Sequence, residues 1–183
     1  MILPIYLYGA EVLRKKSIEA DLNDKERILK LVADMKETLK EADGCGLAAP
    51  QVGVDERILI VDGTDMADVY PYLKDFRRTM INPVVTEESG TRCNYQEGCL
   101  SVPGIYADVN RPSAITVEYY DENFNKATEH LDKFACRMVQ HELGHLKGEL
   151  FTDIVAPVRK KMIARKLQNI EKGRIATRYK SKH

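Results

Sequence analysis

The pentapeptide His141-Glu142-Leu143-Gly144-His145 constrains this chain more than any other feature. On an α-helix, residues four apart lie about 40° apart around the axis, so both imidazoles can reach one metal ion. Glu142 lies about 60° from His145 and can approach a metal-bound water without displacing either ligand. We therefore predict a helix that presents two nitrogen ligands and a carboxylate base, the arrangement that metal-assisted hydrolysis needs.

A catalytic site of this kind needs a third protein ligand and an open fourth position. A metallopeptidase is the alternative function for the pentapeptide, but its two common patterns lack a ligand here. The metzincin pattern requires His where the chain has Phe151, and the gluzincin pattern leaves only Glu171 in the last predicted helix. Cysteines are the remaining candidates, and the residues alone do not separate Cys99 from Cys45, since each stands in a Gly-containing segment.

Apolar periodicity places helices toward both ends of the chain and strands in the middle. Helices are predicted over residues 24–42, 132–147 and 157–173, and the last should turn inward Val158, Met162, Ile163, Leu167 and Ile170. Strands are predicted over residues 57–61, 80–86, 114–120 and 127–131, while residues 62–78 give no readable pattern. We expect an α+β fold, with mixed or antiparallel β-sheets packed around a central metal-binding helix, an N-terminal helix and a C-terminal helix.

Length and composition fit one globular domain. The chain has 183 residues, of which 44% are hydrophobic and 31% are charged. No apolar run approaches the roughly 20 residues that cross a bilayer, and the apolar first seven residues have no basic leader. We therefore expect a cytoplasmic protein without a membrane partner, whose four cysteines are reduced.

Three segments resemble the motifs of the peptide deformylase family, in the family's order. They are Gly44–Gln51 (Gly-x-Gly-Leu-Ala-Ala-x-Gln), Glu97–Ser101 (Glu-Gly-Cys-Leu-Ser) and Gln140–His145 (Gln-His-Glu-x-x-His). Their joint occurrence is far more specific than any one motif. The resemblance implies a metal-dependent hydrolase that removes the N-formyl group from the N-terminal formyl-methionine of nascent polypeptides and releases formate.

The resemblance also implies the metal site. By it, Cys99, His141 and His145 hold one divalent metal ion, and a metal-bound water is the nucleophile. The resemblance implies Fe(II) as the native metal, with Zn, Ni or Co as substitutes. Glu142 is then the general acid/base, which accepts the proton of the water and passes it to the departing amine.

Further roles follow from the same resemblance. The Gln51 amide and the Leu100 backbone N–H would stabilise the negative charge on the formyl oxygen. Cys45, Gly46 and Gly98 would bind the substrate peptide in an extended form. Small residues at these positions suit a formyl group, because a close backbone can exclude larger acyl groups.

Residues around the ligands complete the prediction. We expect Arg111 to pair with Glu97 and to stiffen the segment that carries Cys99. Two positions depart from the family pattern: Gly144 stands where Asp is usual, and Cys45 stands where an aliphatic residue is common. The candidates for the pocket that takes the methionine side chain lie one to two helical turns before His141, at Phe134, Arg137 and Met138.

Charge is distributed unevenly although the net charge is zero. Residues 156–183 contain ten Lys or Arg and one acid, whereas the other 155 residues contain 18 basic and 27 acidic residues. We predict a single deformylase domain over residues 1–173 and a basic C-terminal tail over residues 174–183. A basic segment favours a polyanionic partner, and a deformylase meets its substrate at the ribosome, so we expect transient ribosome association.

Overall fold

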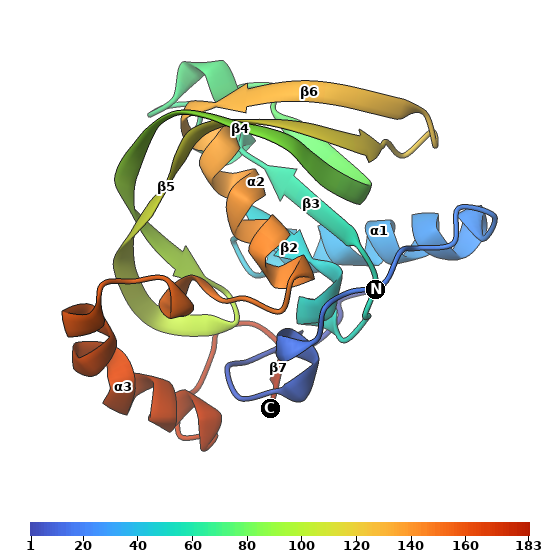
Figure 1. Cartoon of the computed structure of the whole chain (residues 1–183). Helices are drawn as coiled ribbons and strands as arrows, with labels where there is room; N and C mark the ends of the chain where they lie inside the picture. The colour runs from blue at the N-terminus through green and yellow to red at the C-terminus, as the bar shows by residue number, and fades with distance from the viewer.

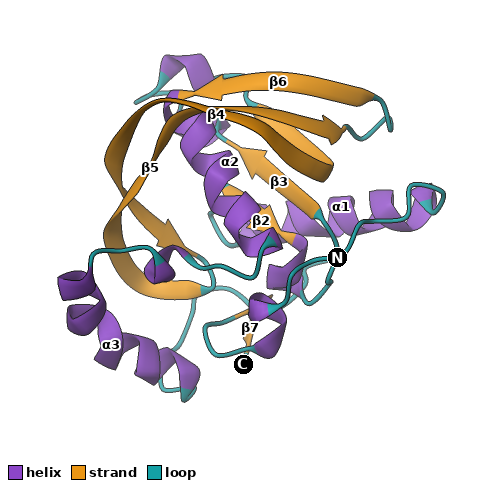
Figure 2. Cartoon of the chain, viewed as in Figure 1, coloured by secondary structure: helices purple, strands orange, loops and turns teal.

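The computed structural model describes residues 1–183 and confirms the α+β class. The larger sheet is antiparallel, with the order β2-β3-β4-β5-β6, and comprises β2 (Gly46–Ala48), β3 (Ile58–Asp62), β4 (Arg77–Cys99), β5 (Val102–Tyr120) and β6 (Lys126–Asp132). The helices are α1 (Lys25–Glu41), α2 (Lys133–Leu146) and α3 (Pro157–Glu171), and they lie on different sides of the sheet (Figure 1 and Figure 2).

Strands β4 and β5 form one long ribbon that curves around α2 (Figure 1). They are 23 and 19 residues long, and only Leu100 and Ser101 separate them, because Cys99 pairs with Val102. Four register shifts interrupt the ladder, and such bulges bend a strand and increase its twist. The predicted strands at 80–86 and 114–120 are therefore only parts of this ribbon.

Helix α2 occupies the centre of the molecule, as predicted. Ten of its 14 residues are buried, and it packs against β2, β3, β5 and β6. The helix is followed by Gly148, whose φ of +76° lies in the left-handed region. A Cβ at this position would also lie 2.5 Å from the carbonyl oxygen of Arg14, so only glycine fits where the chain leaves the helix.

Strand β3 separates α1 from α2. Its side chains alternate between the two faces of the sheet, as a pleated strand requires. Ile58 and Ile60 pack in a cluster with the apolar face of α1, whereas Leu59 and Val61 pack in a cluster with α2. The part of the sheet that leads into the β4–β5 ribbon is thus covered on both sides.

Helix α3 contacts the rest of the molecule through a narrow stripe. Ile163 and Ile170 are buried, and Leu167 between them is half-buried. The prediction that Val158 and Met162 face inward is wrong, because they are 72% and 65% exposed. Residues spaced as 163, 167 and 170 share one helix face, and the first turn of α3 presents its apolar side chains to solvent.

The segment after α3 returns to the beginning of the chain. Strand β7 (Ser181–Lys182) pairs in parallel with β1 (Ile5–Tyr6), and the N–H of Ile5 donates to the carbonyl of Lys180 at 2.9 Å. The domain boundary at residue 173 stays a prediction, but residues 174–183 contact the rest of the fold. No helix is both long and apolar enough to span a membrane.

Candidate metal and hydrolytic site

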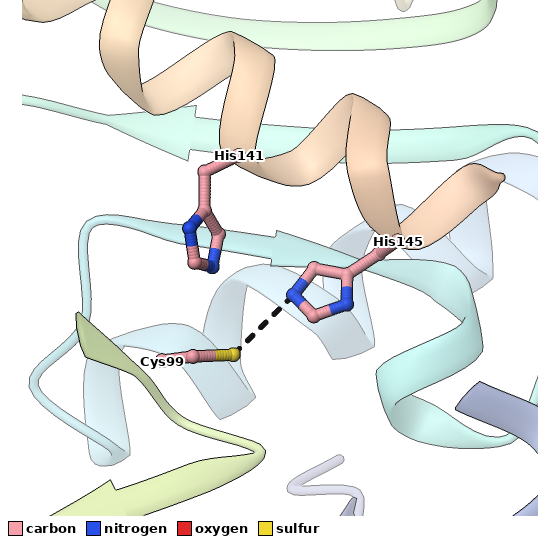
Figure 3. Close-up of side chains that lie close together, drawn as sticks. All are labelled: Cys99, His141 and His145. Carbon is pink, nitrogen blue, oxygen red and sulfur yellow. Dashed lines mark hydrogen bonds between the residues drawn. The ribbon is translucent and has the colours of Figure 1, made fainter. Parts of the chain in front are cut away.

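Cys99, His141 and His145 converge where the end of β4 meets α2 (Figure 3). One ligand atom of each side chain lies within 4.8 Å of the other two, and the Sγ of Cys99 is 3.3 Å from the Nε2 of His145. Two ligands of one tetrahedral ion, at typical Zn–S and Zn–N distances, would be roughly 3.5 Å apart. The donor set and its spacing therefore fit a single metal ion.

Glu97 orients His141. The Nδ1 of His141 lies 3.3 Å from the Oε2 of Glu97, which leaves Nε2 as the ring nitrogen for a metal. Arg111 donates from Nε and Nη2 to the two carboxylate oxygens at 2.7 and 3.0 Å, so the predicted ion pair is present. Burial by itself would raise the pKa of Glu97, but His141 and Arg111 outweigh it and lower this pKa to about 2.

The two imidazoles experience opposite electrostatic environments. Burial favours neutral His141, but its contacts with Cys99 and Glu97 outweigh burial and raise its pKa well above the usual value. For His145, burial and the neighbouring His141 both lower the pKa well below the usual value, so this ring stays neutral, as a metal ligand must. Contact with Cys99 and Glu97 thus favours a positive charge on His141, whereas the His145 ring is held neutral.

Glu142 is buried beside these ligands and has a free carboxylate oxygen. It is 5% exposed, and its Oε2 has no hydrogen-bond partner. Burial raises the pKa of Glu142 to about 7, although the nearby His141 opposes the shift. A pKa near neutrality suits a group that both accepts and donates a proton. Gly46 of β2 makes room for it, because a Cβ there would collide with the Oε1 of Glu142.

Cys45 is not part of the ligand group. Of the two cysteines that the sequence leaves open, only Cys99 is brought to His141 and His145. Burial, with a smaller contribution from Glu142, raises the pKa of the Cys45 thiol to about 12. A metal ligand must be a thiolate, so the environment of Cys45 disfavours that role.

Gln51 and Leu100 lie next to the thiol of Cys99. The buried Gln51 accepts a hydrogen bond from the Ala48 N–H at 2.8 Å, and its Nε2 faces the Ser101 Oγ at 3.1 Å and the Cys99 Sγ at 3.6 Å. The N–H of Leu100 takes part in none of the backbone hydrogen bonds of the chain. The Leu100 N–H is therefore free, and the Gln51 amide lies beside the Cys99 sulfur.

A cavity of about 600 Å³ opens beside this group, and most of the predicted site residues line it. The lining includes the predicted residues Cys45, Gly46, Gln51, Glu97, Gly98, Cys99, Leu100, His141 and Glu142. Gly98 is packed closely, since a Cβ there would lie 2.6 Å from the ring of Tyr106. Arg111 and His145 do not line the cavity, but each contacts a residue that does: Arg111 pairs with Glu97, and His145 lies 3.3 Å from Cys99.

All three candidates for the methionine pocket line the cavity, but they differ in character. Arg137 is buried and donates hydrogen bonds to the backbone carbonyls of Cys93 and Val109, both at 2.9 Å. The Arg137 guanidinium therefore bonds to the backbone of the β4–β5 ribbon. Phe134 and Met138 are the two candidates that present apolar side chains to the cavity.

Comparison with known proteins identifies the family. The family model described as polypeptide deformylase matches residues 2–161. The peptide deformylase of Christiangramia forsetii is 43% identical over 98% of this chain and 95% of its own length, and that of Flavobacterium psychrophilum is 43% identical over 100% and 97%. The chain belongs to the polypeptide deformylase family.

Solved structures agree with this assignment. A crystal structure of peptide deformylase from Plasmodium falciparum superposes with a TM-score of 0.83 at 35% identity and covers 92% of this chain and 95% of that one. A peptide deformylase from Legionella pneumophila gives a TM-score of 0.82 at 32% identity, with 95% and 98% covered. The chain is therefore an enzyme of the expected class, and its fold is that of the family.

Several residues that line the deformylase cavity were not predicted from the sequence. Met66 belongs to the segment over residues 62–78, which gave no readable pattern and which contains two short 3-10 turns. Tyr106 lies on β5. Tyr179 lies in the segment predicted to be a basic tail. Burial, aided by nearby Cys99, raises the pKa of Tyr179 to about 12, so its hydroxyl remains a hydrogen-bond donor. No local signal marked these residues, because distant segments bring them together.

Proposed function

We propose that this chain hydrolyses the N-formyl amide of N-formylmethionyl peptides through a metal site and releases formate. The observation that carries the proposal is the convergence of one thiol, two imidazoles and a buried carboxylate with a free oxygen beside one cavity. Gly46 keeps the wall next to Glu142 free of a side chain. Such a wall suits the formyl group, the smallest acyl group.

Cys99, His141 and His145 would hold one divalent metal ion. Such an ion acts as a Lewis acid that polarises a carbonyl and lowers the pKa of water. A thiol and two imidazoles are soft and intermediate ligands, which suit first-row ions such as iron, cobalt, nickel and zinc. We propose Fe(II) as the native metal, with Zn, Ni or Co as substitutes, and Glu97 as the group that keeps His141 oriented.

We assign the proton transfers to Glu142. Its free Oε2 can accept a proton from the attacking water, and a pKa of about 7 allows the acid to donate the same proton to the departing amine. Negative charge develops on the formyl oxygen during the attack. The Leu100 N–H and the Gln51 amide are the donors that we assign to this charge.

The substrate peptide is proposed to lie extended beside β2. This strand is at the edge of the sheet and pairs only with β3, so its other edge can bind a peptide backbone. Gly46 on this edge and Gly98 on the facing wall would flank the peptide next to the formyl group. The methionine side chain would then contact Phe134 and Met138.

The decisive experiment measures two reactions of anaerobically purified, metal-analysed protein. We expect formate release from a formyl-methionyl peptide and no cleavage of internal peptide bonds. Cys99→Ala should lose both the metal and formate release, whereas Cys93→Ala, an exposed cysteine on the same strand, should keep both. Cleavage of internal bonds without formate would favour the metallopeptidase instead, and an active Cys99→Ala enzyme would reject the ligand assignment.

A second variant separates metal binding from proton transfer. Glu142→Gln keeps the size of the side chain but removes its ability to accept a proton. We expect the metal content to be unchanged and kcat to fall by on the order of 10²- to 10⁴-fold. A variant that retains the wild-type kcat would exclude Glu142 as the acid/base.

We also propose that the enzyme works in the cytoplasm and associates transiently with the ribosome through its basic C-terminal part. Lys161 and Arg165 on α3 are exposed, one helical turn apart, and neither takes part in an ion pair. Charge reversal at both positions should weaken salt-sensitive co-sedimentation with ribosomes. Reversal at Lys40 and Lys74, exposed and distant from α3, is the matched control, and equal loss in both variants would argue against a specific contact.

A further inference from the structure

Three segments that are distant in sequence donate hydrogen bonds to the turn that contains Leu100 and Ser101. The N–H of Tyr8 donates to the Ser101 carbonyl at 2.7 Å, and the Nε2 of Gln51 donates to the Ser101 Oγ at 3.1 Å. From the last segment of the chain, the hydroxyl of Tyr179 donates to the Leu100 carbonyl at 2.5 Å. The Leu100 N–H is left without a partner.

Tyr179 is itself firmly anchored. Its ring packs against two of the three apolar clusters of the molecule. Its backbone carbonyl accepts a hydrogen bond from the Thr177 hydroxyl at 2.6 Å, and the next residues form β7, which pairs with β1. The match to the family model ends at residue 161, so Tyr179 lies outside it although it lines the cavity.

The hydrogen bond acts on the central peptide of a tight turn. Cys99 and Val102 are paired, so the peptide between Leu100 and Ser101 is the middle of a two-residue connection. In such turns this peptide can rotate as a unit, which interchanges turn types that differ mainly in its direction. The Leu100 carbonyl points to opposite sides in the two forms, and a donor fixed at one side favours one form.

We propose that Tyr179 is a positioning residue of the active site. By holding the Leu100 carbonyl it fixes the Leu100 α-carbon, at which the Cys99–Leu100 peptide ends, and so keeps the N–H of that peptide directed at the formyl oxygen. The carbonyl and the N–H of Leu100 flank the same α-carbon. Pairing of Cys99 in the ladder fixes the peptide before Leu100, which carries the Leu100 N–H. Tyr179 fixes the peptide after Leu100, through the Leu100 carbonyl. The inference rests on the proposed function, in which the Leu100 N–H stabilises the charged oxygen.

The test compares Tyr179→Phe with Tyr6→Phe in the metal-loaded enzyme. Both variants remove only a hydroxyl, and Tyr6 belongs to β1, the strand that pairs with β7. For Tyr179→Phe we expect kcat for a formyl-methionyl peptide to fall about tenfold while KM stays within about twofold, because orientation rather than binding is lost. For Tyr6→Phe both constants should equal those of the wild type.

A second readout does not depend on activity. In NMR relaxation-dispersion measurements, the amides of Leu100 and Ser101 should show microsecond-to-millisecond exchange in Tyr179→Phe and none in the wild type or Tyr6→Phe. Unchanged kcat, or a loss of kcat without new exchange at these amides, would overturn the proposal. If the wild type releases no formate, the proposed function fails, and the dispersion data still decide whether Tyr179 locks the turn.

Discussion

At the scale of single residues, the absence of a side chain at Gly46 matters as much as the carboxylate of Glu142. The Glu142 side chain fills the space beside the α-carbon of Gly46, so β2 and α2 approach closely at the place where proton transfer is proposed. A glycine at this position is required by packing and not by backbone conformation, since its φ is not positive. The position of the proposed acid/base therefore depends on a residue that offers no functional group.

Substitution of Gly46 should impair chemistry more than metal binding. In Gly46→Ala the new methyl group must displace the Glu142 carboxylate, and we expect kcat to fall by on the order of 10- to 100-fold with unchanged metal content. Steady-state kinetics and metal analysis measure both. Gly144→Ala, two residues after Glu142, is the control and should retain activity. Wild-type kcat in Gly46→Ala would show that the carboxylate can move without consequence.

Removal of Arg111 tests the support of His141. Arg111→Ala leaves the buried Glu97 with fewer partners, and breaking a buried ion pair typically destabilises by about 3–5 kcal/mol. We expect a loss of this order in denaturant unfolding and about tenfold weaker metal binding. Arg92→Ala, an exposed arginine on the same ribbon that bonds to Asn110, should change stability by less than about 0.5 kcal/mol. Equal stability of the two variants would contradict this role.

The sequence could identify the helix residues of the site but not the third ligand without a family resemblance. The spacing of His141 and His145 follows from helix geometry alone. Cys99 and Cys45 were equivalent by local sequence, because what separates them is the position of the β4–β5 turn relative to α2. Such long-range placement is set by packing, which no local pattern encodes.

At the scale of elements, α2 contains a glycine that packing does not require. Gly144 has ordinary helical conformation, and a Cβ there would meet only the Glu149 carbonyl oxygen, at an ordinary contact distance of 3.6 Å. Gly148, just beyond the same helix, has positive φ and no space for a Cβ. The two glycines therefore have opposite meanings although they lie one turn apart.

These two positions give a matched pair of substitutions. Gly144→Ala should stabilise the protein by about 1 kcal/mol, since alanine loses less conformational freedom in a helix. Gly148→Ala should destabilise it by at least about 1–3 kcal/mol, because of backbone strain and the collision with Arg14. Urea unfolding of both variants measures the difference. Destabilisation by Gly144→Ala would mean that the helix needs glycine for a reason that its contacts do not reveal.

The sequence predicted elements well where apolar side chains recur and poorly where they do not. Helices α1 and α2 agree with the predicted ranges to within one residue at each end. The middle of the β4–β5 ribbon was missed, because residues 91–96 are all exposed and show no alternation of apolar and polar side chains. Hydrogen bonding to the partner strand, and not burial, makes this stretch a strand.

At the scale of the whole molecule, the first and last segments of the chain together support the active site. Strand β1 pairs with β7, Tyr8 bonds to Ser101, and Tyr179 bonds to Leu100. The sequence indicated only charge for residues 174–183, and charge does not report which backbone the segment pairs with. These contacts also make deletion of the segment an ambiguous test of ribosome binding.

Deletion of residues 174–183 should therefore destabilise the fold and the site together. Loss of the β1–β7 hydrogen bonds and of the Tyr179 contacts should lower the free energy of unfolding by about 3 kcal/mol. Lys180→Ala with Lys182→Ala removes two charges but keeps the backbone pairing, and should change stability by less than about 0.5 kcal/mol. Denaturant titration measures both, and a deletion variant as stable as the wild type would show that the segment is dispensable.

The two-residue connection at Leu100 and Ser101 makes the site sensitive to any change in the length of β4. Inserting one residue into β4 just before Cys99 would turn its side chain to the opposite face of the ribbon and carry the neighbouring N–H away with it, because side chains alternate along a strand. The number of residues in β4 thus fixes the directions of the Cys99 sulfur and of the adjacent N–H together.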